Sequence, residues 1–394
     1  MRGPSMISLL IAFLLLVAIS WLVYRLLKKA FPMFAEPFYT RLYWAFSMLT
    51  IACIGSIRML QPGAISPVLI KLAFVWLMGQ IIILFFSPVF YIISRWLAAR
   101  RDTMSSVPQA SRRAFLKTVA GTLPMTALGL SSYGVFSGGS SFVLQRHELF
   151  LATLPAHLDN LKIIQLSDTH IGAFFSVDNL EEVLSVVKRE NPDLLVITGD
   201  LIDDLTLLQP TMDKLNEITS ELKFGVYFSW GNHEYFRDIS KVRKALTNTS
   251  INVLTNSSKL LDDKGQSFYL LGVDYPWADS GYEQVAKRED MFNKAMQGVP
   301  ENAFKILLSH HPDFIHNAFD AGIPLTLTGH THGGQVALMG KSLLPVKYKY
   351  MRGLYQKDNS YGYVSTGTGS WFPFRVGCPA EVTIFTLRRK SIEV

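Results

Sequence analysis

Residues 161–170 read LKIIQLSDTH, a short apolar run followed by a polar group that contains Asp168 and His170. The apolar part has the length and composition of a buried β-strand. The same arrangement returns in DLLVITGD at 193–200, where the apolar run ends at Asp200. Amphipathic segments such as residues 177–189 alternate with these runs, so the sequence from about residue 147 onward predicts an α/β domain.

Three further predicted strands are also followed by polar groups, and the five groups together hold six of the nine histidines. The three later groups are GNHE at 231–234, SHH at 309–311 and GHTHGGQ at 329–335. One His after a strand is more often structural than a metal ligand. Five groups that combine carboxylates, an amide and imidazoles, however, form a mixed oxygen and nitrogen donor set suited to Mn, Fe, Zn or Mg.

The order of these groups, D-x-H, G-D-x-x-D, G-N-H-E, H and G-H-x-H, resembles the calcineurin-like metallophosphoesterases over about residues 161–387. SHHPD and GHTHGGQ look like the bacterial membrane-associated YaeI/YkuE-like subgroup of that family. The resemblance implies a four-layer αββα sandwich of two mixed sheets flanked by helices. It also implies a metal-dependent phosphoric ester hydrolase that holds two divalent ions, with Mn favoured among Mn, Fe, Zn and Mg.

Carried over position by position, the resemblance implies two metal sites that share the carboxylate of Asp200. The first site would consist of Asp168, His170, Asp200 and His332, and the second of Asp200, Asn232, His310 and His330. His233, next to Asn232, would contact the scissile phosphate or protonate the leaving oxygen. The neighbouring Asp203, Glu234 and His311 are equally compatible with orienting roles and with simple structural ones.

The N-terminal third of the chain is much more apolar. Residues 6–24 and 72–94 contain no charged residue, and each stretch is long enough to cross a bilayer. Residues 42–57 are shorter and cross only if Arg41 and Arg58 extend toward the headgroups. We therefore predict a membrane region with about three transmembrane helices at 1–110, tethering a metallophosphoesterase domain at 147–394.

SRRAFLK at 111–117 resembles a twin-arginine export signal, because paired arginines precede a weakly apolar stretch. We expect residues 111–146 to be a signal or anchor segment. The alternative is that these basic residues only flank an ordinary membrane helix and act as a stop-transfer signal.

Charge is distributed unevenly along the chain. Residues 1–147 hold 14 of the 38 Lys and Arg but only two of the 31 acids, a net charge of +12, and the remainder carries −5. The basic balance thus comes from the membrane region and gives no support for nucleic-acid binding. Lys and Arg concentrate at 25–41 and 95–117, which predicts cytoplasmic loops there. The catalytic domain of this multi-pass inner-membrane protein should then lie on the extracytoplasmic side.

The leading functional prediction is a membrane-anchored phosphodiesterase or phosphomonoesterase that uses a metal-activated water, with lipid-linked substrates as a further hypothesis. The basic aromatic stretch 347–352 is either a headgroup contact or a solvated loop, and WFPF at 371–374 is either a membrane-facing lip or core. One alternative is a UDP-2,3-diacylglucosamine-type pyrophosphatase of lipid A synthesis, whose cytoplasmic substrate conflicts with the predicted topology. Another is a non-catalytic, metal-containing membrane receptor or scaffold, against which the intact Asn232–His233 pair argues.

Overall fold

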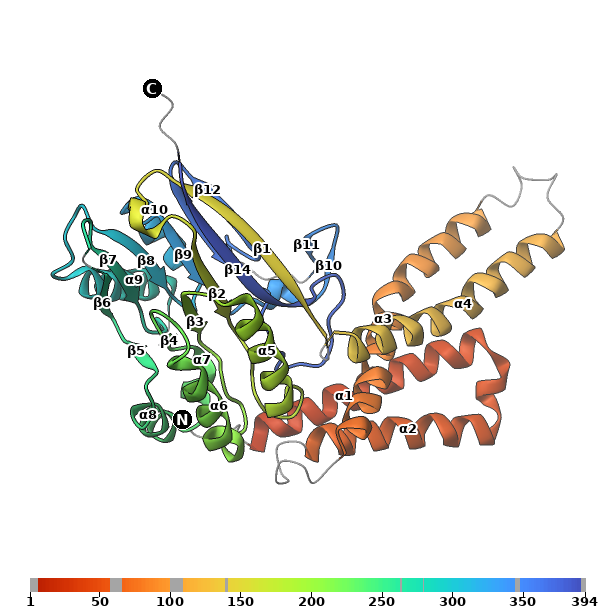
Figure 1. Ribbon diagram of the computed structural model, residues 1–394. Coiled ribbons are helices and arrows are strands. Elements are labelled where there is room, and N and C mark those ends of the chain that lie inside the picture. The colour runs from red at the N-terminus through yellow and green to blue at the C-terminus, as the bar shows by residue number, and fades with distance from the viewer. Residues whose placement is uncertain are drawn as a thin grey trace. The chain divides into compact units, whose positions relative to one another are not determined.

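The computed structural model describes residues 6–56, 66–99, 109–138, 141–262, 264–278, 280–343 and 348–390. The chain divides into two compact units, Met1–Ser137 and Gly138–Val394. The first unit is helical and the second is α/β (Figure 1). Residues 142–146, which the sequence analysis assigns to the signal or anchor segment, form the first half of strand β1 in the second unit.

The first sheet of the α/β unit has six strands in the order β1-β14-β2-β3-β4-β5. Strand β14 runs antiparallel to β2, and the other neighbours are parallel. The strands are Phe142–Leu151 (β1), Ala380–Arg389 (β14), Leu161–Leu166 (β2), Leu194–Thr198 (β3), Val226–Ser229 (β4) and Asn252–Leu254 (β5).

The second sheet also has six strands, in the order β12-β13-β9-β8-β7-β6. It is parallel in its centre and antiparallel at both ends. The strands are Gly353–Lys357 (β12), Ser360–Val364 (β13), Leu325–Thr328 (β9), Phe304–Leu308 (β8), Phe268–Gly272 (β7) and Ser257–Asp262 (β6). A separate two-stranded hairpin consists of Ala337–Leu338 (β10) and Lys341–Ser342 (β11).

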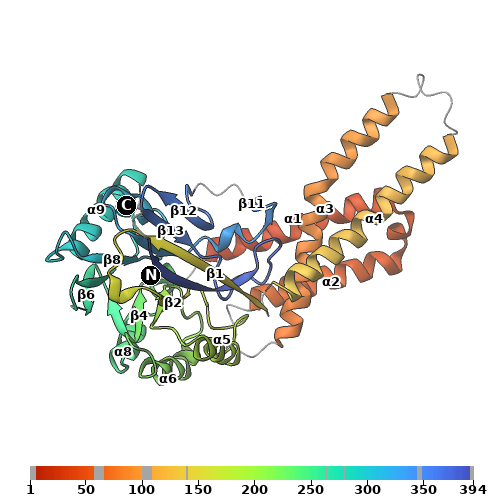
Figure 2. The same ribbon diagram turned by 45° about the horizontal axis from the view of Figure 1, so that its top comes forward.

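Helices cover the outer face of each sheet, which confirms the predicted four-layer sandwich (Figure 2). The first sheet packs on Val177–Glu190 (α5), Leu208–Thr219 (α6) and Ile239–Thr247 (α8), and the second on Gly281–Met296 (α9) and Phe314–Asp320 (α10). The short helix Asn232–Phe236 (α7) follows β4. Short 3-10 helices lie at Pro32–Ala35, Ala156–Leu158, Leu205–Leu207 and His332–Gly334.

The period-two alternation of strand side chains divides the core into layers. In β2, Ile163 belongs to the cluster between the two sheets, and Ile164 to the cluster beneath the helices. The same division holds in β3 for Val196 and Ile197. Both faces of these strands are therefore buried, and for that reason their sequences are continuously apolar.

Local sequence signals set the ends of the helices. Ser176 caps α5 by accepting a hydrogen bond from the Asn179 backbone N–H at 3.2 Å, and Asn191 ends it with a left-handed φ of 47°. The sequence analysis did not predict α6. Pro210 stands in its first turn, where proline is tolerated because the N–H there has no helical partner.

The helical unit contains Met6–Ala30 (α1), Pro37–Ser56 (α2), Pro67–Ala99 (α3) and Gln109–Phe136 (α4). Two stretches of the described residues, Leu10–Ala30 and Pro67–Val89, are long and apolar enough to cross a membrane. Helix α2 covers most of the shorter predicted span, whereas Ile57 and Arg58 lie outside the described residues. The twin-arginine-like residues 111–117 are part of α4.

Replacing Phe304 with Ala should lower the free energy of unfolding by about 3–5 kcal/mol, because its fully buried ring packs against Phe268 between the sheets. Leu354 is 39% exposed, so Leu354→Ala is the matched control and should change stability by about 0.5 kcal/mol or less. Urea unfolding of the full chain in detergent, followed by tryptophan fluorescence, measures both. Equal effects of the two variants would contradict the assignment of Phe304 to the inter-sheet core.

Candidate metal centre

The predicted ligands meet at one edge of the sandwich, where parallel strands of both sheets end. Asp168, Asp200 and Asn232 follow β2, β3 and β4 of the first sheet. His310 and His330 follow β8 and β9 of the second. The two edges are joined directly, since the backbone N–H of His330 donates to both carboxylate oxygens of Asp168 at 3.0 and 3.1 Å. The topology therefore brings together loops that lie far apart in the sequence.

Five of the seven predicted ligands have a left-handed backbone, which non-glycine residues rarely adopt. Each such residue costs about 1–3 kcal/mol and persists only where its surroundings fix it, which happens mainly at functional sites. The residues and their φ angles are Asp168 (52°), His170 (48°), Asp200 (53°), His330 (76°) and His332 (49°).

Asp168, His170 and His332 form a first set, with ligand atoms within 4.8 Å of one another. Nε2 of His332 lies 3.1 Å from Nε2 of His170 and 3.3 Å from Oδ1 of Asp168. Ligand atoms that each lie about 2.0–2.2 Å from one ion are themselves roughly 3–3.5 Å apart. The spacing of this buried set is therefore suitable for a single metal ion.

A second set consists of Asp200, His310 and His330, with Asn232 beside them. Nε2 of His310 lies 3.1 Å from Oδ2 of Asp200, 3.1 Å from Oδ1 of Asn232 and 3.2 Å from Nδ1 of His330. Oδ2 of Asp200 is also 3.6 Å from Nε2 of His170 in the first set. One carboxylate oxygen thus faces both sets.

Hydrogen-bond chemistry shows that the second set suits a cation. Nδ1 of His310 donates to the Thr198 carbonyl at 2.8 Å, so Nε2 of the neutral ring carries a lone pair. That lone pair faces acceptors on Asp200 and Asn232, and acceptors this close require a positive charge between them. A proton can supply it: burial lowers the pKa of His310, but the carboxylates of Asp200 and Asp168 outweigh burial and raise it to about 10. A divalent ion would provide the same compensation.

Arg375 orients His332 by contacting Nδ1, the ring nitrogen that faces away from the other ligands. Its guanidinium is buried, donates to the Thr366 and Gly369 carbonyls, and lies with Nη2 2.8 Å from Nδ1 of His332. A guanidinium has no acceptor, so Nδ1 accepts and the proton of the neutral ring sits on Nε2, facing Asp168. A cation bound at Nε2 would displace that proton. Burial also lowers the pKa of Arg375, to about 10.

His233 is held by two acidic side chains. Its backbone N–H donates to Oδ1 of Asp200 at 2.8 Å, and its Nδ1 lies 2.7 Å from Oδ1 of Asp203, which Arg237 also contacts at 3.0 Å. Burial acts to lower the pKa of His233, but the Asp203 hydrogen bond and the Asp200 charge together raise it. Nε2 is then the ring nitrogen through which a protonated His233 can reach a substrate.

Glu234 and His311 have structural contacts. The carboxylate of Glu234 accepts backbone N–H bonds from Gly231, Asp200 and Leu201, and so ties the loops after β3 and β4 together. A Cβ on Gly231 would lie 2.2 Å from Oδ1 of Asp200, so this approach requires glycine. His311 accepts from the Asp313 N–H at 3.2 Å, and burial lowers its pKa to about 3, which keeps it neutral.

Aromatic residues surround the ligands. The hydroxyl of Tyr348 lies 2.9 Å from Nε2 of His330, so this part of the basic aromatic stretch reaches the site, whereas Lys347 lies outside the described residues. The two ends of the WFPF segment differ in burial. Phe374 is buried, whereas Trp371 is 48% exposed and its ring centroid lies 6.3 Å from that of His233.

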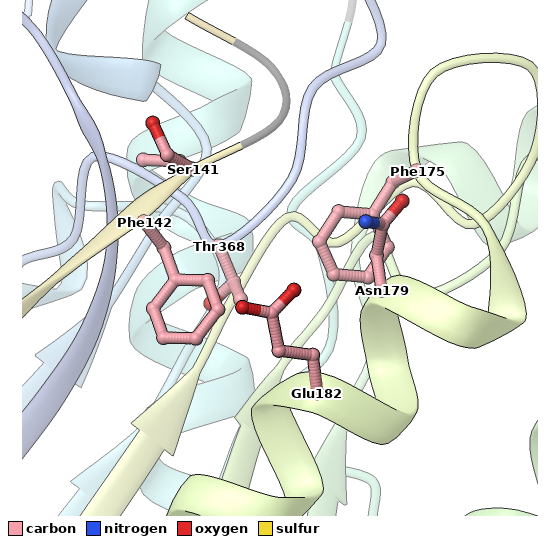
Figure 3. Close-up of a pocket in the computed structure, with 7 residues that line it drawn as sticks. Ser141, Phe142, Phe175, Asn179, Glu182 and Thr368 are labelled. Carbon is pink, nitrogen blue, oxygen red and sulfur yellow. The ribbon is translucent and has the colours of Figure 1, made fainter. Parts of the chain in front are cut away.

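A small cavity elsewhere in the α/β unit is not an alternative substrate site (Figure 3). It is lined by Phe142, Phe175, Asn179 and Glu182, among others, and its volume of about 10 Å³ accommodates roughly one water molecule. A phosphate ester does not fit there.

Comparison with known proteins agrees with this geometry. A model of the calcineurin-like phosphoesterase family matches residues 161–334. The chain is 30% identical over 298 residues to the uncharacterized metallophosphoesterase YkuE of Bacillus subtilis, covering 71% of this chain and 98% of YkuE. This chain belongs to the calcineurin-like phosphoesterase family. It is accordingly a phosphoric ester hydrolase, and the predicted family is confirmed.

Two further relatives of this phosphoesterase are a vertebrate transmembrane protein and a bacterial phosphodiesterase. The transmembrane protein with metallophosphoesterase domain of Danio rerio is 29% identical over 335 residues, 81% of this chain and 73% of that protein. Phosphodiesterase YaeI of Escherichia coli is 28% identical over 286 residues, 70% of this chain and 99% of YaeI.

Sequence reasoning missed two parts of the phosphoesterase site. Arg375 stands 43 positions after His332 in a loop without a recognisable motif, and it lies beyond the family match. Tyr275, whose hydroxyl is 3.4 Å from Nε2 of His330, follows β7 in the segment VDYPW, which resembles none of the five groups. Neither position carries a local signal by which it could have been found.

Asp200→Ala should reduce bound metal from about two ions per chain to one or fewer, because a single carboxylate serves both sets. Asp213→Ala, an exposed acid on α6, is the matched control and should bind metal like the unmodified protein. Elemental analysis of protein purified with Mn²⁺ gives the stoichiometry. Full metal content in Asp200→Ala would show that the two sets do not share this residue.

Proposed function

We propose that this phosphoesterase is a membrane-anchored, dinuclear-metal enzyme that hydrolyses phosphate monoesters or diesters with water as the nucleophile. The observation that carries the proposal is the position of Asp200, whose Oδ2 faces His310 at 3.1 Å and His170 at 3.6 Å. A carboxylate between two ligand sets is suited to bridge two cations. In this proposal Asp168, His170 and His332 hold one ion with Asp200, and Asn232, His310 and His330 hold the other.

Two bound divalent ions would lower the pKa of a coordinated water toward about 7 and offset the charge on the phosphoryl oxygens. The protein's own residues fix the geometry and move the proton. Asp203 holds Nδ1 of His233, and the raised pKa of that ring favours the imidazolium near neutral pH. His233 can then donate a proton from Nε2 to the leaving oxygen, a contribution of about 10²–10⁴ in rate.

The donor set leaves the choice of metal open between several ions. Carboxylate, amide and imidazole ligands accept Mn, Fe, Zn or Mg. Among these we propose Mn²⁺, because a site with both hard oxygen and imidazole donors accommodates it without thiolate ligands.

A lipid-linked phosphate ester is the proposed substrate class. Two helices of the first unit are long and apolar enough to cross a membrane, and an enzyme tethered there meets lipid headgroups continually. Exposed Trp371 and Phe236 lie beside His233, with Phe236 at a ring distance of 5.3 Å. Aromatic side chains at such a position favour the membrane interface. The names of the Danio rerio relative and of YaeI are compatible with a membrane-bound phosphodiesterase.

The catalytic domain is proposed to lie on the extracytoplasmic side of the inner membrane. The support is the clustering of Lys and Arg at 25–41 and 95–117, which is typical of cytoplasmic loops, together with the twin-arginine-like sequence at 111–117.

A panel of phosphoesters tests the enzymatic proposal. With Mn²⁺ the full-length protein should hydrolyse bis(p-nitrophenyl) phosphate, p-nitrophenyl phosphate or phospholipid headgroups, and chelator should abolish turnover. His233→Ala should lower kcat by about 10²–10⁴ while metal content stays unchanged, since His170 and Asp200, with which its ring forms a further group of possible ligands, keep their places in the two proposed metal sites. His157→Ala, a substitution of a histidine remote from this site, is the control. Unaltered kcat in His233→Ala would remove this residue from proton transfer.

A reporter fused to the C-terminus tests the topology. Alkaline phosphatase fused there should be active, and β-galactosidase, which is active only in the cytoplasm, should be inactive, because the cation distribution favours a location of this end outside. The reverse pattern would place the active site in the cytoplasm and refute the extracytoplasmic location.

A further inference from the structure

The helical unit contains an open cavity of about 300 Å³ that is lined by residues of all four helices. Helix α4 contributes Gly121, Pro124, Met125 and Leu128 to its wall. The spacing i, i+3, i+4, i+7 places these four residues on one helical face. The volume lies at the lower end of the range for ligand pockets in proteins, about 300–1,000 Å³.

Helix α3 lines the same cavity with four residues at the same i, i+3, i+4, i+7 spacing. Trp76, Gly79, Gln80 and Ile83 form its wall, so each of the two stripes contains one glycine. At Gly79 the backbone approaches Leu128 closely, where a Cβ would be 3.3 Å from its Cδ2. At Gly121 a Cβ would meet no heavy atom within 4 Å. A side chain at position 121, which lines the cavity, would therefore enter open space.

The polar side chains at the wall are already paired with one another. Gln80 accepts from Ser20 at 3.0 Å and donates to Ser47 at 3.2 Å, and the indole N–H of Trp76 also donates to Ser47 at 3.1 Å. Tyr43 donates to the Ser20 carbonyl at 2.7 Å. These groups therefore need no polar ligand, and the rest of the wall is apolar. The cavity is suited to a hydrocarbon chain rather than to a headgroup.

The cavity opens beside a cluster of cations. Met125 and Met33, which are 72% and 42% exposed, stand at its edge, and their flexible thioether side chains adapt readily to an apolar ligand. Lys28 and Lys29 stand in the last turn of helix α1, just before Phe31 of the cavity wall. Basic residues near the end of a membrane helix attract anionic headgroups.

We propose that this cavity binds one acyl chain of an anionic bilayer phospholipid, with the headgroup near Lys28 and Lys29. The inference rests on the proposed membrane location but not on the hydrolase chemistry. It assigns the helical unit a specific lipid site in addition to its anchoring role.

Photolabelling tests the site in the full-length protein reconstituted into vesicles. The probe is phosphatidylglycerol with a diazirine at the end of one acyl chain. Ile83 lines the cavity and is 8% exposed, whereas Phe85 on the same helix is 70% exposed. Label on Phe85 reports contact with bulk lipid, and label on Ile83 reports entry into the cavity. Excess unlabelled phosphatidylglycerol should reduce the label on Ile83 much more than that on Phe85.

Gly121→Phe fills the cavity and should lower labelling of Ile83 at least about tenfold, while labelling of Phe85 remains. Gly129→Phe is the matched control: Gly129 lies on the same helix with no heavy atom within 4 Å of a Cβ, but it does not line the cavity. Label on Phe85 but none on Ile83 in the unmodified protein would overturn the lipid site. Equal labelling of Ile83 in both variants would overturn it too, and an unlabelled Phe85 would instead refute the membrane location.

Discussion

Two buried carboxylates that lie close to each other determine the electrostatics of the site in the α/β unit. Asp168 and Asp200 are 0% and 2% exposed, and an isolated charge at such depth is strongly disfavoured. Burial raises the pKa of Asp168. For Asp200 the effect of burial is outweighed by His310, which holds the pKa of this carboxyl well below its usual value. The site therefore requires positive charge, and imidazoles delivered by both sheets place that charge, or the ions that replace it, between the two carboxylates.

This requirement accounts for the backbone around the site. The left-handed conformations of Asp168 and His170 are held by bonds from their N–H groups to the carbonyls of Gly199 and Asp200, at 3.0 and 2.9 Å. The Gly369 N–H in turn donates to the Asp168 carbonyl at 3.1 Å. Loops from different strands thus determine one another's shape, which allows strained ligand residues to persist. Such a pre-set site needs little reorganisation when it binds cations and a phosphate ester.

The helical unit is held together by other interactions. In lipid, burial of apolar side chains contributes little to helix association, so close packing and polar contacts between helices matter more. Both are present: Gly79 allows close approach of α3 and α4, and Gln80 links α1, α2 and α3 through Ser20 and Ser47. One chain therefore combines a unit whose stability comes from a dry apolar core with a helical unit that contains two stretches long and apolar enough to cross a membrane.

By itself the sequence determined the chemistry of this protein and most of its central strands, because donor type, strand composition and helix caps are local properties. LKIIQLSDTH is recognisable as a strand by itself, whereas Asp168 and His170 are recognisable as ligands only together with the four later polar groups. Only the tertiary structure revealed Arg375 behind His332, Tyr348 against His330, and β1 pairing with β14 from the far end of the chain. Local sequence does not specify which of these positions meet, and the contacts arise only when the two sheets stack and their edges meet.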